Sequence, residues 1–131
     1  PVRVYWEDTD AGGIVFHANY LKYFERARTE WLRARGVEQG ALREQTGGVF
    51  VVSDAQLRYL RAARLDDALT ITTKIHEKGR ASMSMQQKAL RKPKHPALGE
   101  LLVEAIIRIG WVDASTLRPA RMPLWLLERL S

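Results

Sequence analysis

The chain has 131 residues, enough for one domain with its own core and too few for two ordinary domains, so we expect a single domain over residues 1–131. It contains 21 lysines and arginines against 15 aspartates and glutamates, which gives a net charge of +6 and a pI near 10.0. Cysteine is absent, which excludes disulfides, zinc–thiolate sites and thiol nucleophiles. We also expect no membrane span and no signal peptide, because no apolar run is long enough for either. These features predict a cytoplasmic location.

The positive charge suits an anionic partner such as nucleic acid, an acidic protein, anionic lipid or a phosphorylated small molecule. The basic residues are dispersed along the chain, and no recognisable nucleic-acid-binding module accompanies them. We therefore expect no nucleic-acid partner and favour a small phosphorylated ligand.

The first predicted elements are a short strand and a long helix. Residues 2–6 alternate as a strand would, with Val2, Val4 and Trp6 on one face. The helix is expected to start after Asn19 as N-cap and to stop at Gly36. Its apolar stripe consists of Tyr20, Phe24, Ala27, Trp31 and Ala34. Such a wide apolar face needs a broad partner, which a sheet can supply.

The remainder of the chain reads mostly as strands. Residues 37–48 predict a short helix or an irregular linker that ends at the two glycines Gly47 and Gly48. Four strand candidates follow, at residues 49–60, 69–77, 80–90 and 101–112. Residues 92–96 predict a loop because they contain two prolines, and residues 119–130 end the chain with a short predicted helix that has Pro123 at its first position. One helix followed by antiparallel strands with short links predicts an α+β fold, a curled sheet of about five strands around one long helix.

The stretch between the first strand and the long helix is the candidate site. Residues 7–20 place three carboxylates, a pair of glycines and a helix N-terminus within fourteen positions. A carboxylate facing a bound carbonyl, with helix-end N–H groups polarising that carbonyl, would suit acyl transfer. The residue types alone allow an acidic loop before a helix equally well.

The run Asp8-x-Asp10-x-x-Gly13-Ile14-Val15-Phe16-His17-x-Asn19-Tyr20 resembles the signature of hotdog-fold thioesterases of the 4-hydroxybenzoyl-CoA thioesterase type. More narrowly, it is similar to the Tol-Pal-associated acyl-CoA thioesterases. The similarity continues through Glu25, Arg28 and Glu30, then through residues 58–69 and the strand around Arg108, so it covers most of the chain. The resemblance implies a hotdog fold, hydrolysis of an acyl-CoA substrate without metal or redox cofactor, and sheets joined between subunits with active sites at their boundary. It also implies homodimer pairs that form a homotetramer.

The resemblance implies that Asp10 is the catalytic carboxylate, either as nucleophile or as general base. Its ordinary alternative is an Asx turn beside glycine. The backbone N–H of His17 would polarise the thioester oxygen, and whether the His17 side chain also reacts is left open. Seven residues are expected to bind substrate around this entrance: Gly13, Ile14, Val15, Phe16, Asn19, Tyr20 and Tyr59. We interpret Glu7 and Asp8 as structural or solvated.

Four basic residues are candidates for binding the phosphates of coenzyme A: Arg61, Arg64, Lys78 and Arg80. Arg80 is favoured because it follows Gly79 at a predicted strand start, where related enzymes bind the nucleotide. Each of the four could equally be solvated surface. No metal is expected, because His17, His76 and His95 are far apart in sequence and the acidic loop lacks two ligand positions of a calcium loop.

Two other functions remain open from the sequence. One is a hotdog dehydratase acting on acyl thioesters, although such enzymes usually depend on a histidine-led site. The other is a non-catalytic basic module that binds acyl carrier protein or another acidic partner. Acyl carrier protein is also a possible partner of the thioesterase itself.

Overall fold

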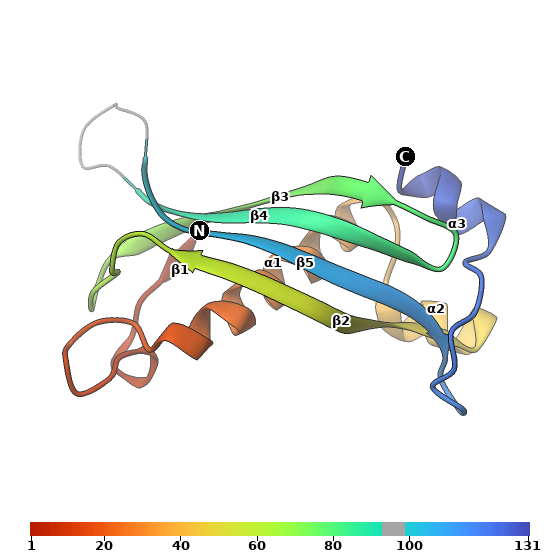
Figure 1. The fold of residues 1–131 in the computed structure, drawn as a ribbon, viewed down its shortest axis with the longest axis horizontal. Helices are drawn as coiled ribbons and strands as arrows, with labels where there is room; N and C mark the ends of the chain where they lie inside the picture. The colour runs from red at the N-terminus through yellow and green to blue at the C-terminus, as the bar shows by residue number, and fades with distance from the viewer. Residues whose placement is uncertain (93–98) are drawn as a thin grey trace.

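The computed structural model describes residues 1–92 and 99–131, and these form a curled antiparallel sheet over one long helix (Figure 1). The sheet has the strand order β1-β3-β4-β5-β2. This confirms the predicted α+β architecture. Of the loop predicted at residues 92–96, residues 93–96 lie outside the described residues, as does His95. The elements are β1 (Val2–Arg3), α1 (Tyr20–Ala34), α2 (Gln39–Thr46), β2 (Gly48–Tyr59), β3 (Ala68–Lys78), β4 (Ser82–Arg91), β5 (Glu100–Asp113) and α3 (Leu124–Arg129).

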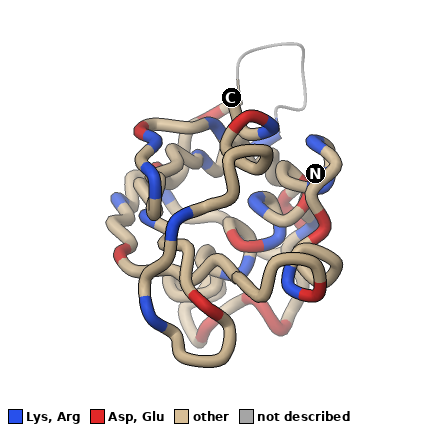
Figure 2. The backbone as a smooth tube through the Cα atoms, turned by 90° about the vertical axis from the view of Figure 1, so that its right-hand side faces the viewer, with Lys and Arg blue, Asp and Glu red and all other residues tan. Residues whose placement is uncertain are grey.

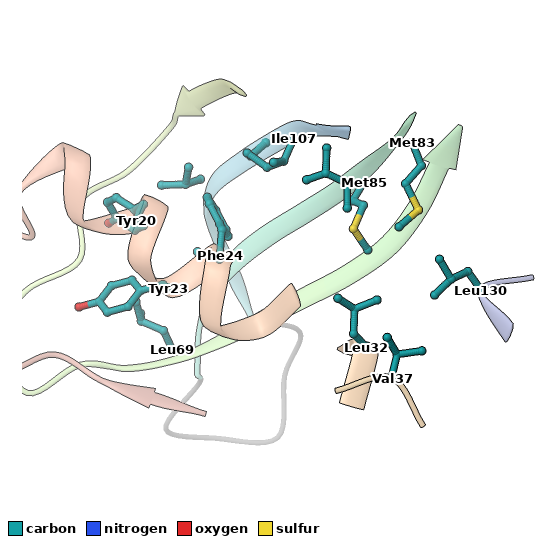
Figure 3. Close-up of a cluster of buried hydrophobic side chains, with 14 of the residues drawn as sticks. Tyr20, Tyr23, Phe24, Leu32, Val37, Leu69, Met83, Met85, Ile107 and Leu130 are labelled. Atoms are coloured by element: carbon teal, nitrogen blue, oxygen red, sulfur yellow. The ribbon is translucent and has the colours of Figure 1, made fainter. Parts of the chain in front are cut away.

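The core lies between α1 and the concave face of the sheet. Side chains alternate along β4, so that Met83 and Met85 are buried against the helix while their neighbours are half-buried. Figure 3 shows the side chains of Tyr20, Tyr23 and Phe24 on α1 in one cluster with Met83, Met85 and Ile107 on the strands. Each large side chain buried here stabilises the fold by roughly 1.5–3 kcal/mol.

The buried face of α1 is rotated from the predicted stripe. Ala34 is exposed, so its place in the stripe was wrong, whereas Ala27 and Trp31 are half-buried and Trp31 packs against the core. The buried positions are Tyr20, Tyr23, Phe24, Arg28 and Leu32. The sequence pattern missed this face because it includes a charged residue.

Arg28 is only 8% exposed and enters a buried polar network with β4. Its Nη1 donates to Oε1 of Gln87 at 2.9 Å, and Gln87 is itself fully buried. The Gln87 amide then donates to the Phe24 carbonyl and to Oγ1 of Thr73, both at 2.9 Å. Burial lowers the pKa of Arg28, and the nearby charge of Glu25 opposes that shift. The network therefore ties the middle of α1 to the centre of the sheet.

The first strand is shorter than predicted. β1 ends at Arg3, and residues Trp6–Asp8 form a turn of 3₁₀ helix that leaves Trp6 79% exposed. The chain turns here because the Tyr5 N–H donates to Oδ2 of Asp8 and the Asp8 N–H donates to the Tyr5 carbonyl. Val4 stays in the core, whereas Trp6 does not share its face.

The other helices and strands lie close to the positions predicted for them. Gly36 and Gly47 adopt φ values of +76° and +72° just after α1 and α2, as expected of glycines that end helices. The residues between them form the short helix α2. Arg80 lies in the turn before β4 and not at a strand start, and Pro123 immediately precedes α3. Such differences of one or two residues are usual at the ends of elements.

Charged residues of both signs surround the molecule. Seen from the end that carries α2 and α3, basic and acidic positions are interspersed and do not gather into one field (Figure 2). Within the described residues, no helix has the length and apolar composition required to span a membrane.

Candidate active site

Residues 7–17, here called the motif loop, fold back on themselves before α1. Thr9 and Val15 form an antiparallel bridge, and the Asp10 N–H donates to the Ile14 carbonyl at 2.9 Å. The Gly13 N–H closes a turn by donating to the Asp10 carbonyl at 3.0 Å. Gly13 has a φ of +77°, a left-handed conformation that glycine adopts without strain. The glycine therefore allows a tight loop with Asp10 at its base.

The Asp10 side chain is exposed and held by one local hydrogen bond. Its Oδ1 accepts the Gly12 N–H at 2.8 Å, which is the Asx turn that the sequence allowed. Its Oδ2 accepts no hydrogen bond from the residues the structure describes. The turn thus orients the carboxylate and leaves one oxygen free to act on a ligand.

His17 begins a turn of 3₁₀ helix that runs directly into α1. The Phe16 N–H donates to the Asp8 carbonyl at 2.9 Å, and the Asn19 N–H donates to the Phe16 carbonyl at 2.8 Å. The His17 N–H itself has no acceptor within residues 1–92 and 99–131. It is one of the unpaired donors that every helix start leaves, and it can bind an external oxygen.

Tyr59 lies beside this helix start. Its hydroxyl donates to the His17 carbonyl at 2.8 Å. The ring centroids of Tyr59 lie 6.2 Å from His17 and 5.8 Å from Tyr20, and Phe16 is 4.6 Å from His17. Burial raises the pKa of Tyr59, so the hydroxyl stays protonated as a donor. Together these rings form an aromatic wall on one side of the entrance.

The remaining predicted binding residues differ in how accessible they are. Phe16 and Gly13 are exposed, whereas Val15 and Tyr20 are 4% and 2% exposed and belong to the core. Ile14 is half-buried and pairs through its backbone with Arg64. Any contact of Val15 or Tyr20 with a ligand would therefore require the core to open at this point.

Asn19 occupies the N-cap position, but its side chain makes no capping hydrogen bond. Its Nδ2 donates to Oδ1 of Asp8 at 2.8 Å, and the residue is 8% exposed. Burial alone would raise the pKa of Asp8, but hydrogen bonds from the Tyr5 N–H and the Asn19 side chain hold that pKa below its ordinary value. Burial and the adjacent Asp8 carboxylate raise the pKa of Tyr23 in turn. This cluster could not be predicted from the sequence, because no sequence pattern indicates that positions 8, 19 and 23 meet.

The four candidate phosphate-binding residues do not lie together. Arg61 and Arg64 are at the motif-loop end of the sheet, where Arg61 also pairs with Glu100 at 3.2 Å. Lys78 and Arg80 are at the opposite end of β3, next to α3. The strand separates the two pairs by about 33 Å, at about 3.3 Å per residue. One copy of this fold cannot bring all four to one nucleotide.

A groove of about 440 Å³ runs between α1 and the outer strand β2. Apolar side chains line most of it, including Leu21, Phe50, Val52 and Ile107, and Arg28 lies at its floor. β2 pairs with β5 along one edge only, and in the described part of the chain its other edge is free. Within the same residues no group of three or more His, Asp or Glu side chains is placed to hold a metal ion.

The profile of the thioesterase-like superfamily matches residues 4–130 of this chain. The acyl-CoA thioesterase YbgC of Haemophilus influenzae is 41% identical over 123 residues, which cover 94% of this chain and 86% of that protein. The acyl-CoA thioester hydrolase YbgC of Escherichia coli O157:H7 is 42% identical, with coverage of 94% and 87%. The acyl-CoA thioesterase YbgC of Helicobacter pylori strain J99 is 36% identical, with coverage of 98% and 96%.

Solved structures share the fold. A probable thioesterase from Bartonella henselae superposes with a TM-score of 0.82 at 35% identity, covering 93% of this chain and 95% of that one. A mutant 4-hydroxybenzoyl-CoA thioesterase, in complex with 4-hydroxybenzoyl-CoA, superposes with a TM-score of 0.91 at 23% identity, covering 99% and 95%. With the profile match and the three relatives, these findings show that the chain belongs to the thioesterase-like superfamily and has its hotdog fold.

Proposed function

We propose that the protein is an acyl-CoA thioesterase that hydrolyses the thioester to a free acid and coenzyme A. The observation that carries this proposal is that one loop presents two groups without a hydrogen-bond partner among the described residues, one carboxylate oxygen of Asp10 and the N–H of His17. The names of the YbgC relatives support the reaction and the substrate class. Water supplies the second reactant.

The two groups have complementary roles in thioester hydrolysis. The His17 N–H donates to the carbonyl oxygen and stabilises the negative charge that develops there, with the positive end of α1 behind it. Asp10 either attacks the carbonyl carbon and expels the thiolate of coenzyme A, giving a mixed anhydride that water then cleaves to the free acid, or removes a proton from a water molecule that attacks the carbonyl carbon and expels the same thiolate. Both routes require the ionised carboxylate, so activity falls in acid.

A dimer would complete the site. The free edge of β2 exposes Val51 and Val52 at 37% and 53%, and an exposed apolar edge is prone to pair with another strand. If two β2 strands pair in antiparallel orientation, the Tyr59 end of one strand lies opposite the Gly48 end of the other. His17, which is bound to Tyr59, lies at the same place. The groove beside Phe50 in one copy then meets the motif loop of its partner.

The same pairing explains the separated basic residues. Lys78 and Arg80 lie at the same end of the sheet as Gly48, the first residue of β2. This end is formed by the backbone next to α3, which Lys78 and Arg80 contact, and by the end of β5, which pairs with Gly48. In an antiparallel dimer this end of one copy approaches the motif loop of the other, beside Arg61 and Arg64. A coenzyme A molecule could then reach basic residues from both copies. A homotetramer built from such dimers, an acyl carrier protein partner and a cytoplasmic location stay predictions from the sequence.

The test is release of free thiol from short, long and aromatic acyl-CoA substrates by the wild type, Asp10→Asn and Glu7→Gln. Glu7 is the matched control, since it is an exposed carboxylate of the same loop with no role in the proposed chemistry. We expect Asp10→Asn to lose about 10²–10⁴-fold in rate and Glu7→Gln to retain it. Equal release of thiol by the wild type and Asp10→Asn would show that the catalytic site does not include Asp10. No release from any substrate by the wild type would favour the non-catalytic alternative.

A further inference from the structure

Asp8 joins the two ends of the motif loop through three hydrogen bonds. Its Oδ2 accepts the Tyr5 N–H at 2.9 Å, and its Oδ1 accepts Nδ2 of Asn19 at 2.8 Å. Its backbone carbonyl accepts the Phe16 N–H at 2.9 Å. Asp8 is half-buried and Asn19 is 8% exposed, so solvent competes little for the bond between their side chains. We call this pair the Asp8–Asn19 clamp.

Both residues of the clamp hydrogen-bond the backbone of Phe16, the residue that precedes His17. The Phe16 carbonyl accepts the Asn19 N–H at 2.8 Å, while the Phe16 N–H is bound to Asp8. Because a trans peptide is planar, its carbonyl and its N–H point in opposite directions. A hydrogen bond that fixes the Phe16 carbonyl therefore also fixes the direction of the free His17 N–H. Asn19 contributes that bond with its backbone while its side chain is held by Asp8.

We propose that Asp8 and Asn19 are positioning residues, which hold the His17 N–H in the direction that a thioester carbonyl requires. This inference rests on the proposed function and assigns roles that the sequence analysis did not foresee. In this proposal Asn19 does not contact the substrate but acts through the neighbouring peptide group, since the Asn19 amide is buried against Asp8. It also gives Asp8 a role in catalysis beyond the local turn at Tyr5.

The alternative is a purely structural role, in which Asp8 only stabilises the turn at residues 5–8. The two roles differ in what a variant changes. A structural role affects the melting temperature alone, whereas a positioning role lowers kcat of the folded enzyme. A small displacement of a catalytic donor can cost about 10²-fold in rate.

The chain allows the clamp to be exchanged. Asn19→Asp places two carboxylates against each other, and their repulsion at pH 8 should separate the two side chains. In Asp8→Asn/Asn19→Asp the exchanged amide can donate to the exchanged carboxylate, and its own oxygen can still accept the Tyr5 N–H. Asp8→Asn alone keeps an oxygen for Tyr5 and can regain the second bond by rotation of the Asn19 amide.

The experiment compares kcat, KM and melting temperature of the wild type, both single variants, the exchanged double variant and Glu7→Gln, on one acyl-CoA substrate. We expect Asn19→Asp to lose roughly 10–10²-fold in kcat with KM changed by less than about threefold, in line with a displaced donor. Asp8→Asn should lose only a few-fold, and the exchanged variant should regain most of the rate. Should Asn19→Asp not fold, Asn19→Ala, which leaves Oδ1 of Asp8 without its partner, takes its place in the comparison.

Two results would overturn the inference. One is a folded Asn19→Asp or Asn19→Ala variant with wild-type kcat. The other is an exchanged variant that regains the melting temperature but not the rate. Neither result touches the proposed function, which depends on thiol release by the wild type and its loss in Asp10→Asn. A wild type without thioesterase activity would refute the function first, and the clamp proposal with it.

Discussion

The hydroxyl of Tyr59 donates to the carbonyl oxygen of His17 at 2.8 Å, and so joins the last residue of β2 to the helix start that carries the proposed donor. The two residues are 42 positions apart in sequence. Within the described residues the other edge of the same strand is unpaired, and it is the edge proposed above for dimer formation. The hydrogen bond between Tyr59 and His17 therefore connects the edge strand β2 directly to the helix start.

Tyr59→Phe removes this hydrogen bond and keeps the aromatic wall. We expect the free energy of unfolding to fall by about 0.5–1 kcal/mol, since the site is partly exposed, and kcat to fall several-fold. Urea unfolding and thiol release measure the two effects. Tyr5→Phe is the matched control, because the Tyr5 side chain is 61% exposed and its hydroxyl makes no hydrogen bond in the described part of the chain. An equal loss of activity in both variants would contradict the prediction.

Gly12 and Gly13 should respond to alanine in different ways. A Cβ at Gly13 meets no atom within 4 Å, but the φ of +77° is strained for alanine, so Gly13→Ala should lower the free energy of unfolding by roughly 1–2 kcal/mol. A Cβ at Gly12 would lie 3.2 Å from Oδ1 of Asp10. Gly12→Ala should therefore displace the carboxylate and reduce kcat with little loss of stability. Denaturant unfolding and steady-state kinetics of both variants check this, and equal effects on stability would refute it.

Gly48 has no room for a side chain. A Cβ there would overlap the ring of Trp111, whose position is held by the core. Gly48→Ala should therefore lower the free energy of unfolding by about 1–3 kcal/mol, as overpacked sites do. Gly40→Ala on the exposed face of α2 is the control, because its Cβ meets nothing within 4 Å. A Gly48→Ala protein as stable as Gly40→Ala would contradict the observed packing.

Asp8 makes stability depend on pH in acid. Its pKa in the folded protein is below the ordinary value of 3.8, so its contribution to stability is complete above that value. The contribution is lost as the pH falls through the lower, folded pKa. We expect wild type to be more stable than Asp8→Asn at pH 6, and the difference to shrink as the pH falls below about 4. Urea unfolding between pH 6 and pH 2.5 measures this, with Glu7→Gln as control. A constant difference would show that the Asp8 charge is not involved.

The free edge of β2 should be the dimer interface. Val52→Lys places a charge on that edge and should yield a monomer with little activity, because the partner's basic residues and groove are lost. Leu124→Lys is the control, since Leu124 is 72% exposed on α3. Light scattering after size exclusion gives the mass of each variant. A Val52→Lys protein that remains a dimer would place the interface elsewhere.

Much of the fold could be read from the sequence because its signals are local. Gly36 and Gly47 mark helix ends, and alternation through Met83 and Met85 marks a buried strand face. The motif loop was recognisable for the same reason, since Asp10 and His17 lie within one short run.

What the sequence did not predict depends on contacts between distant positions. Arg28 is a charged residue, so a search for apolar periodicity does not place it in the buried face of the helix. Its burial depends on a hydrogen bond to Gln87, which is 59 positions away in sequence. Asn19 looked like a helix cap because its bond with Asp8 has no sequence signal. Lys78 and Arg61 appeared equivalent as phosphate ligands until the length of β3 placed them at opposite ends of the sheet.

The bond between Arg28 and Gln87 also determines where α1 sits along its axis. A shift of the helix by one turn, about 5.4 Å, would carry the guanidinium among apolar side chains and leave Gln87 without its partners, at the cost of burying unpaired polar groups. An all-apolar helix face would tolerate several such offsets with similar energy. Because the motif loop continues directly into α1, the polar network that fixes the position of the helix also fixes the position of the candidate active site. The network lies about three turns further along the helix than His17, and it fixes the position along the helix axis at which His17 contacts Tyr59.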